Sequence, residues 1–169
     1  MSAQPSSLEQ RIAKLEAIEA IKQLKARYLA ACDQKQVEQI RDCFVEQSVD
    51  IDYGAVGRFS HRDQLVALFD QVGNHDYMVE MHHAQNPQIT IIDEDTAEAE
   101  WGLFYYLVNT QENSLTQLGG CYRDGYRRID GQWYIAKSHF SVDSTVASQL
   151  SDGVAQVVFA GNPQLQPAV

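Results

Sequence analysis

The segment that most constrains this fold is residues 18–44, which predicts a long amphipathic helix followed at once by a second helix. Charged residues such as Lys22 and Arg27 lie mostly away from its apolar side. A helix with one apolar stripe must pack on another apolar layer, and the only candidate is the sheet predicted downstream. The stripe recurs at helical spacing and consists of Ala17, Ile18, Ile21, Leu24, Tyr28 and Cys32.

The helix boundaries follow from capping signals. The first helix is expected to span about residues 8–31. Asp33, three residues before Gln36, has the pattern of an N-cap, so the second helix is predicted to begin there. A third helix is expected to begin with Ser60 as its N-cap and to end near Gly73.

From Tyr77 onward the hydrophobic period changes to two, which predicts a series of strands. Pro87 should force a bend, a bulge or an edge position in the first of them. Trp101, Leu103 and Tyr105 share the parity expected to face the helices. The fold class is therefore α+β, with a curved antiparallel sheet forming a cone around the long N-terminal helix, and two further helices. Strands are expected at 49–53 and 58–59, before the third helix, and then at 78–92, 97–108, 118–129 and 132–142.

A single domain is expected over residues 1–169, with its core at about 8–142. Residues 143–169 are expected to form a helical turn or two and an irregular tail that covers or flanks the pocket. A curved sheet of this kind leaves an open mouth, where ligand pockets form.

Composition excludes several classes of function. A net charge of −10 argues against nucleic acid and weakly against anionic membranes. Three scattered cysteines without a CxxC spacing suggest free thiols in a reducing compartment, and no apolar run approaches the length of a membrane span. We therefore expect a cytoplasmic protein. GxSxG, P-loop and dinucleotide fingerprints do not occur in the sequence.

The candidate catalytic residues are Tyr28, Asp33 and one histidine of the pair His82–His83. On a continuous helix Tyr28 and Asp33 would point about 140° apart, so they converge only if the helix ends between them. Neighbours on a strand face opposite ways, so the two histidines cannot bind one metal together, and parity alone leaves the choice between them open. A histidine held by a carboxylate is a common general base, although a lone histidine is more often structural and Asp33 is also a plain helix cap. A metal site of His82, His139 and Asp33 is conceivable, but no ligand-spaced pair supports it, and no metal is expected.

Three segments resemble the SnoaL-like branch of the nuclear-transport-factor-two-like superfamily, over about residues 15–142. Among its members, the chain resembles bile-acid dehydratase, scytalone dehydratase and lindane dehydrochlorinase. The resemblance implies a cone that acts without metal or organic cofactor, and a homo-oligomer in which a trimer is favoured over a dimer. The segments are IEAIKQLKARYLAACDQKQ (18–36), MHHAQNPQITI (81–91) and GGCYRDGYRRIDGQWYI (119–135).

The resemblance also implies residue roles. In those enzymes an aspartate at the end of the first helix orients a histidine, which removes a proton while water or halide leaves the neighbouring carbon. Asp33 matches the aspartate and His82 matches the base. Tyr28 matches a tyrosine that polarises a carbonyl or assists the leaving group.

The chain also departs from these relatives. Tyr105 stands where the bile-acid enzyme has a second aspartate, and Ser138 stands where the dehydrochlorinase has an arginine. Tyr53 and His139 are the candidates to replace them. The expected substrate-binding residues are Tyr53, Tyr105, His139, Trp101 and Leu103.

We therefore expect a cofactor-independent lyase, dehydratase or isomerase that acts on a small, largely apolar cyclic substrate of steroid, polyketide or aromatic type. Two alternatives are a non-catalytic small-molecule binding module of the same fold and the small subunit of a ring-hydroxylating oxygenase. The expected partner is a small molecule in an apolar pocket, with neither nucleic acid nor membrane involved.

Overall fold

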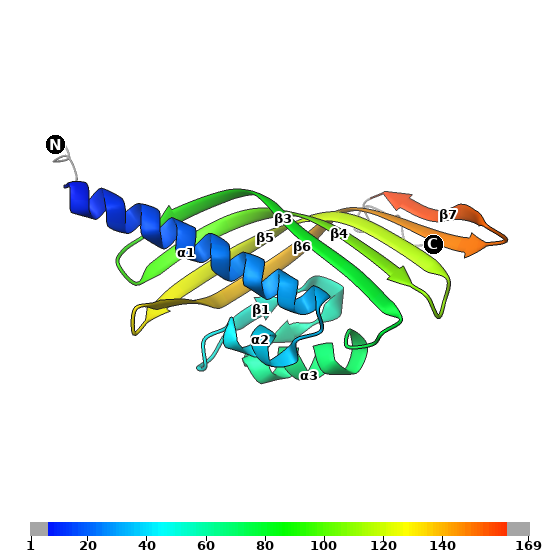
Figure 1. The fold of residues 1–169 in the computed structure, drawn as a ribbon, viewed down its shortest axis with the longest axis horizontal. Coiled ribbons are helices and arrows are strands. Elements are labelled where there is room, and N and C mark those ends of the chain that lie inside the picture. Colours follow the sequence, from blue (N-terminus) through cyan, green and yellow to red (C-terminus); the bar gives the residue numbers. More distant parts are fainter. Residues whose placement is uncertain (1–6, 162–169) are drawn as a thin grey trace.

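A computed structural model describes residues 7–161 of the chain. The helices come first and a long strand meander follows, as the sequence predicts (Figure 1). The helical elements are α1 (Leu8–Asp33), α2 (Val37–Asp42), the 3₁₀ turn η1 (Gly54–Val56) and α3 (Arg62–Val72). The strands are β1 (Asp50–Asp52), β2 (Arg58–Phe59), β3 (Met78–Ile91), β4 (Thr96–Asn109), β5 (Ser114–Ile129), β6 (Gln132–Ser151) and β7 (Val154–Gly161).

The strands form one curved sheet in the order β2-β1-β6-β5-β4-β3, with β7 paired to β6. Consecutive strands from β3 to β7 pair antiparallel. The pairing of β1 with β6 is parallel, so the prediction of a purely antiparallel sheet is wrong at this edge. The chain enters β1 from α2 and not through a hairpin with β6, which leaves β1 free to run in the same direction as β6.

Pro87 has the predicted effect on β3. This strand forms one edge of the sheet, and its register with β4 shifts between Gln85 and Gln88. Asn86, next to the proline, has φ 51°. The proline without an N–H group is thus accommodated at a bulge in an edge strand.

The sequence correctly places the beginning of α1, but it assigns two other caps wrongly. Ser7 caps α1 in a capping box with Gln10. Asp33 is the last residue of α1 and does not cap α2, whose N-cap is Gln36 with no side-chain hydrogen bond. The cap of α3 is His61 and not Ser60.

The predicted irregular tail is also wrong for residues 143–161. Strand β6 continues to Ser151, and a turn with positive φ at Asp152 and Gly153 leads into β7. Residues 144–149 pair with β5, and residues 145–151 pair with β7. Apolar and polar residues do not alternate regularly in this stretch, so backbone pairing and not apolar alternation defines it. Residues 162–169 lie outside the described part of the chain.

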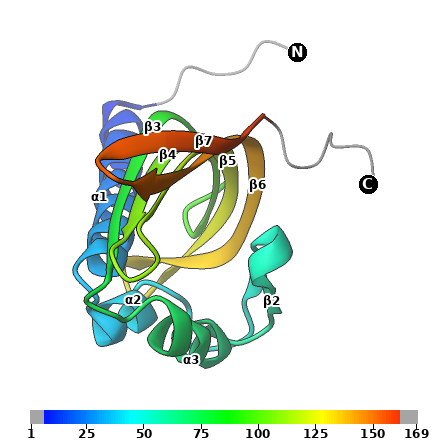
Figure 2. The ribbon, with the colours of Figure 1, turned by 90° about the vertical axis from the view of Figure 1, so that its right-hand side faces the viewer.

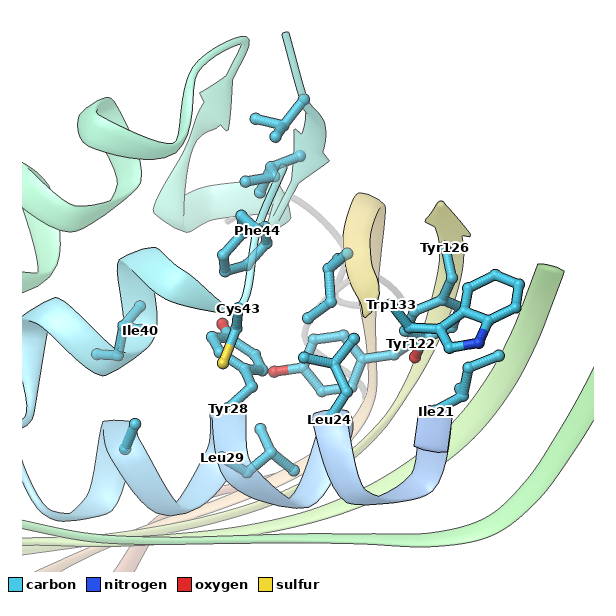
Figure 3. Close-up of a cluster of buried hydrophobic side chains, with 14 of the residues drawn as sticks. Ile21, Leu24, Tyr28, Leu29, Ile40, Cys43, Phe44, Tyr122, Tyr126 and Trp133 are labelled. Carbon is cyan, nitrogen blue, oxygen red and sulfur yellow. The ribbon is translucent and has the colours of Figure 1, made fainter. Parts of the chain in front are cut away.

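The core lies between α1 and the concave face of the sheet. Viewed along its length, the sheet curls, with α1 along one side and α2 and α3 at the base (Figure 2). Leu24 and Tyr28 rise from α1 toward Tyr122 of β5, and Phe44 packs edge-on against Tyr28 with ring centroids 5.3 Å apart (Figure 3). Burial of these side chains holds α1 against the sheet. The same packing carries the C-terminal end of α1 to strand β3.

Candidate active site

An interior cavity of about 330 Å³ lies between the C-terminal half of α1, helix α3 and the concave face of the sheet. Its wall is mostly apolar, with a few polar groups that converge on it, which is the usual character of a small-molecule site. The polar and aromatic lining residues are Tyr28, Cys32, Tyr53, Phe69, Glu80, His82, Tyr105, Tyr122 and Phe140. The aliphatic lining residues include Val56, Leu65, Leu68, Val72, Met78, Leu103 and Leu118.

Asp33 holds His82 at the edge of this cavity. Its Oδ1 lies 2.7 Å from Nδ1 of the ring, and both carboxylate oxygens accept a hydrogen bond from the His82 backbone N–H at 3.1 Å. A carboxylate accepts, so Nδ1 carries the proton and Nε2 keeps a lone pair. Within residues 7–161, Nε2 has no hydrogen-bond partner. His82 lines the cavity and the adjacent His83 does not.

Two cavity tyrosines begin a hydrogen-bonded chain that leads into the core. The hydroxyls of Tyr28 and Tyr53 lie 2.9 Å apart, and Tyr53 donates to Ser138 Oγ at 3.2 Å. Ser138 in turn donates to Asp124 Oδ1 at 2.8 Å. Burial raises the pKa of both tyrosines above the ordinary range, which keeps them protonated.

This chain of hydrogen bonds ends at a fully buried ion pair. Lys25 Nζ donates to Asp124 Oδ2 at 2.8 Å, and both side chains have 0% exposure. Tyr126 donates to the same oxygen at 2.9 Å. Burial lowers the pKa of Lys25, and the attraction of Asp124 opposes that shift. Asp124 accepts from Lys25, Tyr126 and Ser138, and the Lys25 ammonium also lies over the Tyr122 ring, so both buried charges are compensated.

A second carboxylate, that of Glu80, lines the cavity from the same strand as His82, two residues earlier. Tyr105 donates to Glu80 Oε1 at 2.7 Å, and Lys35 forms an ion pair with the same carboxyl group. The Tyr105 ring lies 4.6 Å from the His82 ring, centroid to centroid. Burial and the Glu80 charge both raise the pKa of Tyr105.

The structure brings five of the eight predicted site residues to the cavity wall: Tyr28, Tyr53, His82, Leu103 and Tyr105. Asp33 contacts His82 but does not line the cavity, and the expectation that the helix ends between Tyr28 and Asp33 is wrong, because α1 continues to Asp33. Trp101 is buried elsewhere in the core, where Nε1 donates to Tyr126 at 3.0 Å. His139 lies outside the cavity, with Nε2 2.9 Å from Asp50 Oδ1.

Sequence reasoning missed several residues of the wall, above all Glu80, Tyr122 and Phe140. Strand parity could have found Tyr122, because it shares a face of β5 with the buried Asp124 and Tyr126. The contribution of α3 is a matter of tertiary packing that periodicity does not reveal.

In the described residues, no three His, Cys, Asp or Glu side chains are grouped so that they could hold a metal ion. Asp33, His82 and His139 are therefore not brought together as a triad. Between Ser7 and Gly161, no helix is long and apolar enough to cross a membrane.

A curved sheet closed over a long helix, with a ligand-sized cavity inside, defines the α+β cone class of protein. The chain belongs to the SnoaL-like domain family, whose model matches residues 13–139. The sequence resemblance to this family is thereby confirmed.

Solved structures with the same fold include a candidate dehydratase, a dehydrochlorinase and an NTF2-like protein. A candidate scytalone dehydratase from Novosphingobium aromaticivorans DSM 12444 is 21% identical, with a TM-score of 0.73 over 94% of this chain and 99% of its own. A type 2 hexachlorocyclohexane dehydrochlorinase, LinA, is 16% identical, with a TM-score of 0.75 over 84% and 94%. An NTF2-like protein with a cystatin-like fold from N. aromaticivorans is 19% identical, with a TM-score of 0.70 over 84% and 92%. At these identities the likeness defines the fold.

Proposed function

We propose that this protein is a cofactor-independent lyase, dehydratase or isomerase in which His82 is the general base and Asp33 orients it. The observation that carries this proposal is the 2.7 Å contact between Asp33 Oδ1 and His82 Nδ1, while Nε2 lies at a mostly apolar cavity without a hydrogen-bond partner among residues 7–161. The substrate class is a small, largely apolar cyclic molecule of steroid, polyketide or aromatic type. The names of the structural relatives, a dehydratase and a dehydrochlorinase, support an elimination reaction.

The proposed elimination begins at a carbon next to a carbonyl group. Nε2 of His82 takes the proton, and the C–H electron pair becomes the double bond of an enolate. The enolate then expels a hydroxyl group from the neighbouring carbon, and that group leaves as water with the proton from the imidazolium. Asp33 stabilises the imidazolium between these two steps, because its carboxylate faces Nδ1.

The experiment that tests the base does not require the natural substrate. 1-Tetralone is a bicyclic ketone of suitable size with exchangeable protons next to its carbonyl. In D₂O the wild-type protein should accelerate deuterium exchange at that carbon, measured by NMR, and His82→Ala should lower the acceleration by about 10²- to 10⁴-fold. His83→Ala is the matched control, because the neighbouring ring does not line the cavity. Equal exchange in His82→Ala and wild type would refute the role of His82.

A non-catalytic binding module is the second candidate, supported by the same mostly apolar cavity. It would bind 1-tetralone without accelerating exchange, and His82→Ala would leave the affinity unchanged. The oxygenase small-subunit alternative instead requires a large subunit that copurifies with this chain. From the family resemblance we also propose that the protein forms a homo-oligomer, and we favour a trimer over a dimer. Analytical ultracentrifugation would measure the number of subunits.

A further inference from the structure

Four tyrosine hydroxyls border the cavity, and each has one proton to donate. A hydroxyl can donate to a ligand only if its proton is not already used in a hydrogen bond within the protein. The hydrogen-bond directions therefore determine which tyrosine can bind a ligand carbonyl. The four are Tyr28, Tyr53, Tyr105 and Tyr122.

The buried carboxylate of Asp124 fixes the direction of the longest chain. It can only accept, so Ser138 spends its single proton on Oδ1. The Ser138 oxygen must then accept from Tyr53 at 3.2 Å. With that proton spent, Tyr53 accepts from Tyr28 at 2.9 Å. The proton of Tyr28 is thus directed toward the core, and its oxygen offers the cavity only lone pairs.

Tyr105 is committed in the same way. It donates to Glu80 Oε1 at 2.7 Å, and the ion pair with Lys35 keeps that carboxyl group an acceptor. His82 donates from Nδ1 to Asp33 and presents a lone pair at Nε2. The cavity wall is therefore rich in acceptors and short of donors.

Tyr122 differs from the other three. Its hydroxyl makes no hydrogen bond with any residue of the described chain, and its side chain extends from β5 toward Tyr28 (Figure 3). The Lys25 ammonium lies 3.4 Å from its ring centroid. A cation on the ring face draws electron density from the phenol, which strengthens the O–H group as a donor. Burial raises the pKa of Tyr122, so the donor stays protonated at neutral pH.

We propose that Tyr122 is the hydroxyl that donates a hydrogen bond to the oxygen of the ligand. Asp124, held by Lys25, is the positioning residue that withholds the protons of Tyr53 and Tyr28. The ligand class that fits this wall is a cyclic hydroxyketone, whose carbonyl accepts from Tyr122 while its hydroxyl donates to the lone pair of Tyr28, so that Nε2 of His82 stays available as the base. This assignment rests on the proposed function only in placing the ligand in the same cavity.

The test compares two probes that differ by one acceptor. 1-Tetralone carries a carbonyl oxygen, and tetralin, the parent hydrocarbon, lacks it. Isothermal titration of the full chain should show tighter binding of 1-tetralone. Tyr122→Phe should weaken the binding of 1-tetralone about 3- to 10-fold, which corresponds to the loss of one neutral hydrogen bond. The affinity for tetralin should change by less than about 2-fold. Tyr106→Phe, on the strand face opposite to Tyr105 and outside the cavity lining, is the control and should keep the wild-type ratio.

The positioning role has its own readout. Ser138→Ala removes the acceptor of Tyr53, which then donates to Tyr28 and frees the Tyr28 proton for the ligand. Tyr28→Phe should therefore reduce the preference for 1-tetralone more strongly in the Ser138→Ala background than in wild type. A merely structural role of Ser138 would give the same reduction in both backgrounds.

The proposal is overturned if wild type binds 1-tetralone no more tightly than tetralin, or if neither probe binds. It is also overturned if Tyr122→Phe leaves the ratio of 1-tetralone affinity to tetralin affinity unchanged, or if Tyr28→Phe lowers this ratio as much as Tyr122→Phe does. His82→Ala separates this result from the proposed function. If the protein binds 1-tetralone more tightly than tetralin but deuterium exchange does not depend on His82, the general-base role of His82 is refuted and the assignment of Tyr122 is supported.

Discussion

The carboxylate of Asp33 binds His82 at two places at once, the ring Nδ1 at 2.7 Å and the backbone N–H at 3.1 Å. The ring contact sets the tautomer, and the backbone contact fixes the strand that carries the ring. One side chain thereby controls both the protonation pattern and the position of the candidate base.

The two contacts of Asp33 predict different effects for two substitutions. Asp33→Asn keeps an oxygen for the backbone N–H but loses the charge that stabilises an imidazolium, so exchange of 1-tetralone should fall about 10²-fold or more. Its free energy of unfolding should change by less than about 1 kcal/mol. Asp33→Ala loses both contacts and should cost about 1–3 kcal/mol in urea unfolding. An Asp33→Ala protein as stable as wild type would contradict the backbone role.

The buried Lys25–Asp124 pair should respond unequally to single and double substitution. Lys25→Met leaves Asp124 charged and buried without its cation, which should cost about 3–5 kcal/mol. The double variant Lys25→Met/Asp124→Asn removes both charges and should recover most of that loss. Urea unfolding of the four proteins of the cycle measures the coupling. Additive losses in the double variant would mean that the two charges do not depend on each other.

Gly120 should not tolerate a side chain. A Cβ there would lie 2.4 Å from the Ser141 carbonyl oxygen and 2.5 Å from the Phe140 ring, which lines the cavity. Gly120→Ala should therefore destabilise the protein by about 1–3 kcal/mol and weaken 1-tetralone binding by displacing Phe140. Gly102→Ala, whose Cβ would be 3.4 Å from the nearest atom, is the matched control. Thermal unfolding and titration of both variants provide the comparison.

Alkaline pH should destabilise the fold steeply. Burial raises the pKa of five of the eight tyrosines, Tyr28, Tyr53, Tyr105, Tyr122 and Tyr126. Their unfolded pKa is about 10, so above that pH the unfolded chain releases protons that the folded chain keeps. Stability from these groups is complete below about pH 10 and is lost as the pH rises above it. Buried phenolate absorbance should then appear together with unfolding; its appearance at pH 10 in a folded protein would contradict this.

The sequence predicts α1 and the strand meander because the spacing of apolar residues is a local property, and the packing of the fold keeps the elements that this spacing indicates. It also predicts which face Leu103 and Tyr105 occupy, since parity along a strand is unaffected by the rest of the fold. Parity does not give position along the sheet, and for this reason Trp101 shares that face yet lies away from the cavity.

For other residues the sequence predicts the wrong role or position, either because two local patterns are compatible with the same residue or because no local pattern indicates its place in the fold. Asp33 has the pattern of a helix cap, and only the tertiary approach of β3 gives its carboxylate to His82 instead. His139 is adjacent to Ser138, whose hydroxyl points inward to Asp124, so alternation already directs His139 outward. The contact between Asp33 and His82 was expected from the family resemblance and from no pattern within the chain.

The edge strand β3 also bears on how copies of this protein meet. An open edge exposes N–H and C=O groups that can template a strand from another molecule, the first step of aggregation. Here Asp33 occupies the N–H of His82, and the bulge between Gln85 and Gln88, with Pro87 inside it, interrupts the ladder further along. A second chain finds no continuous run to extend on this edge. The residue that orients the candidate base thus also occupies a backbone donor of the edge strand.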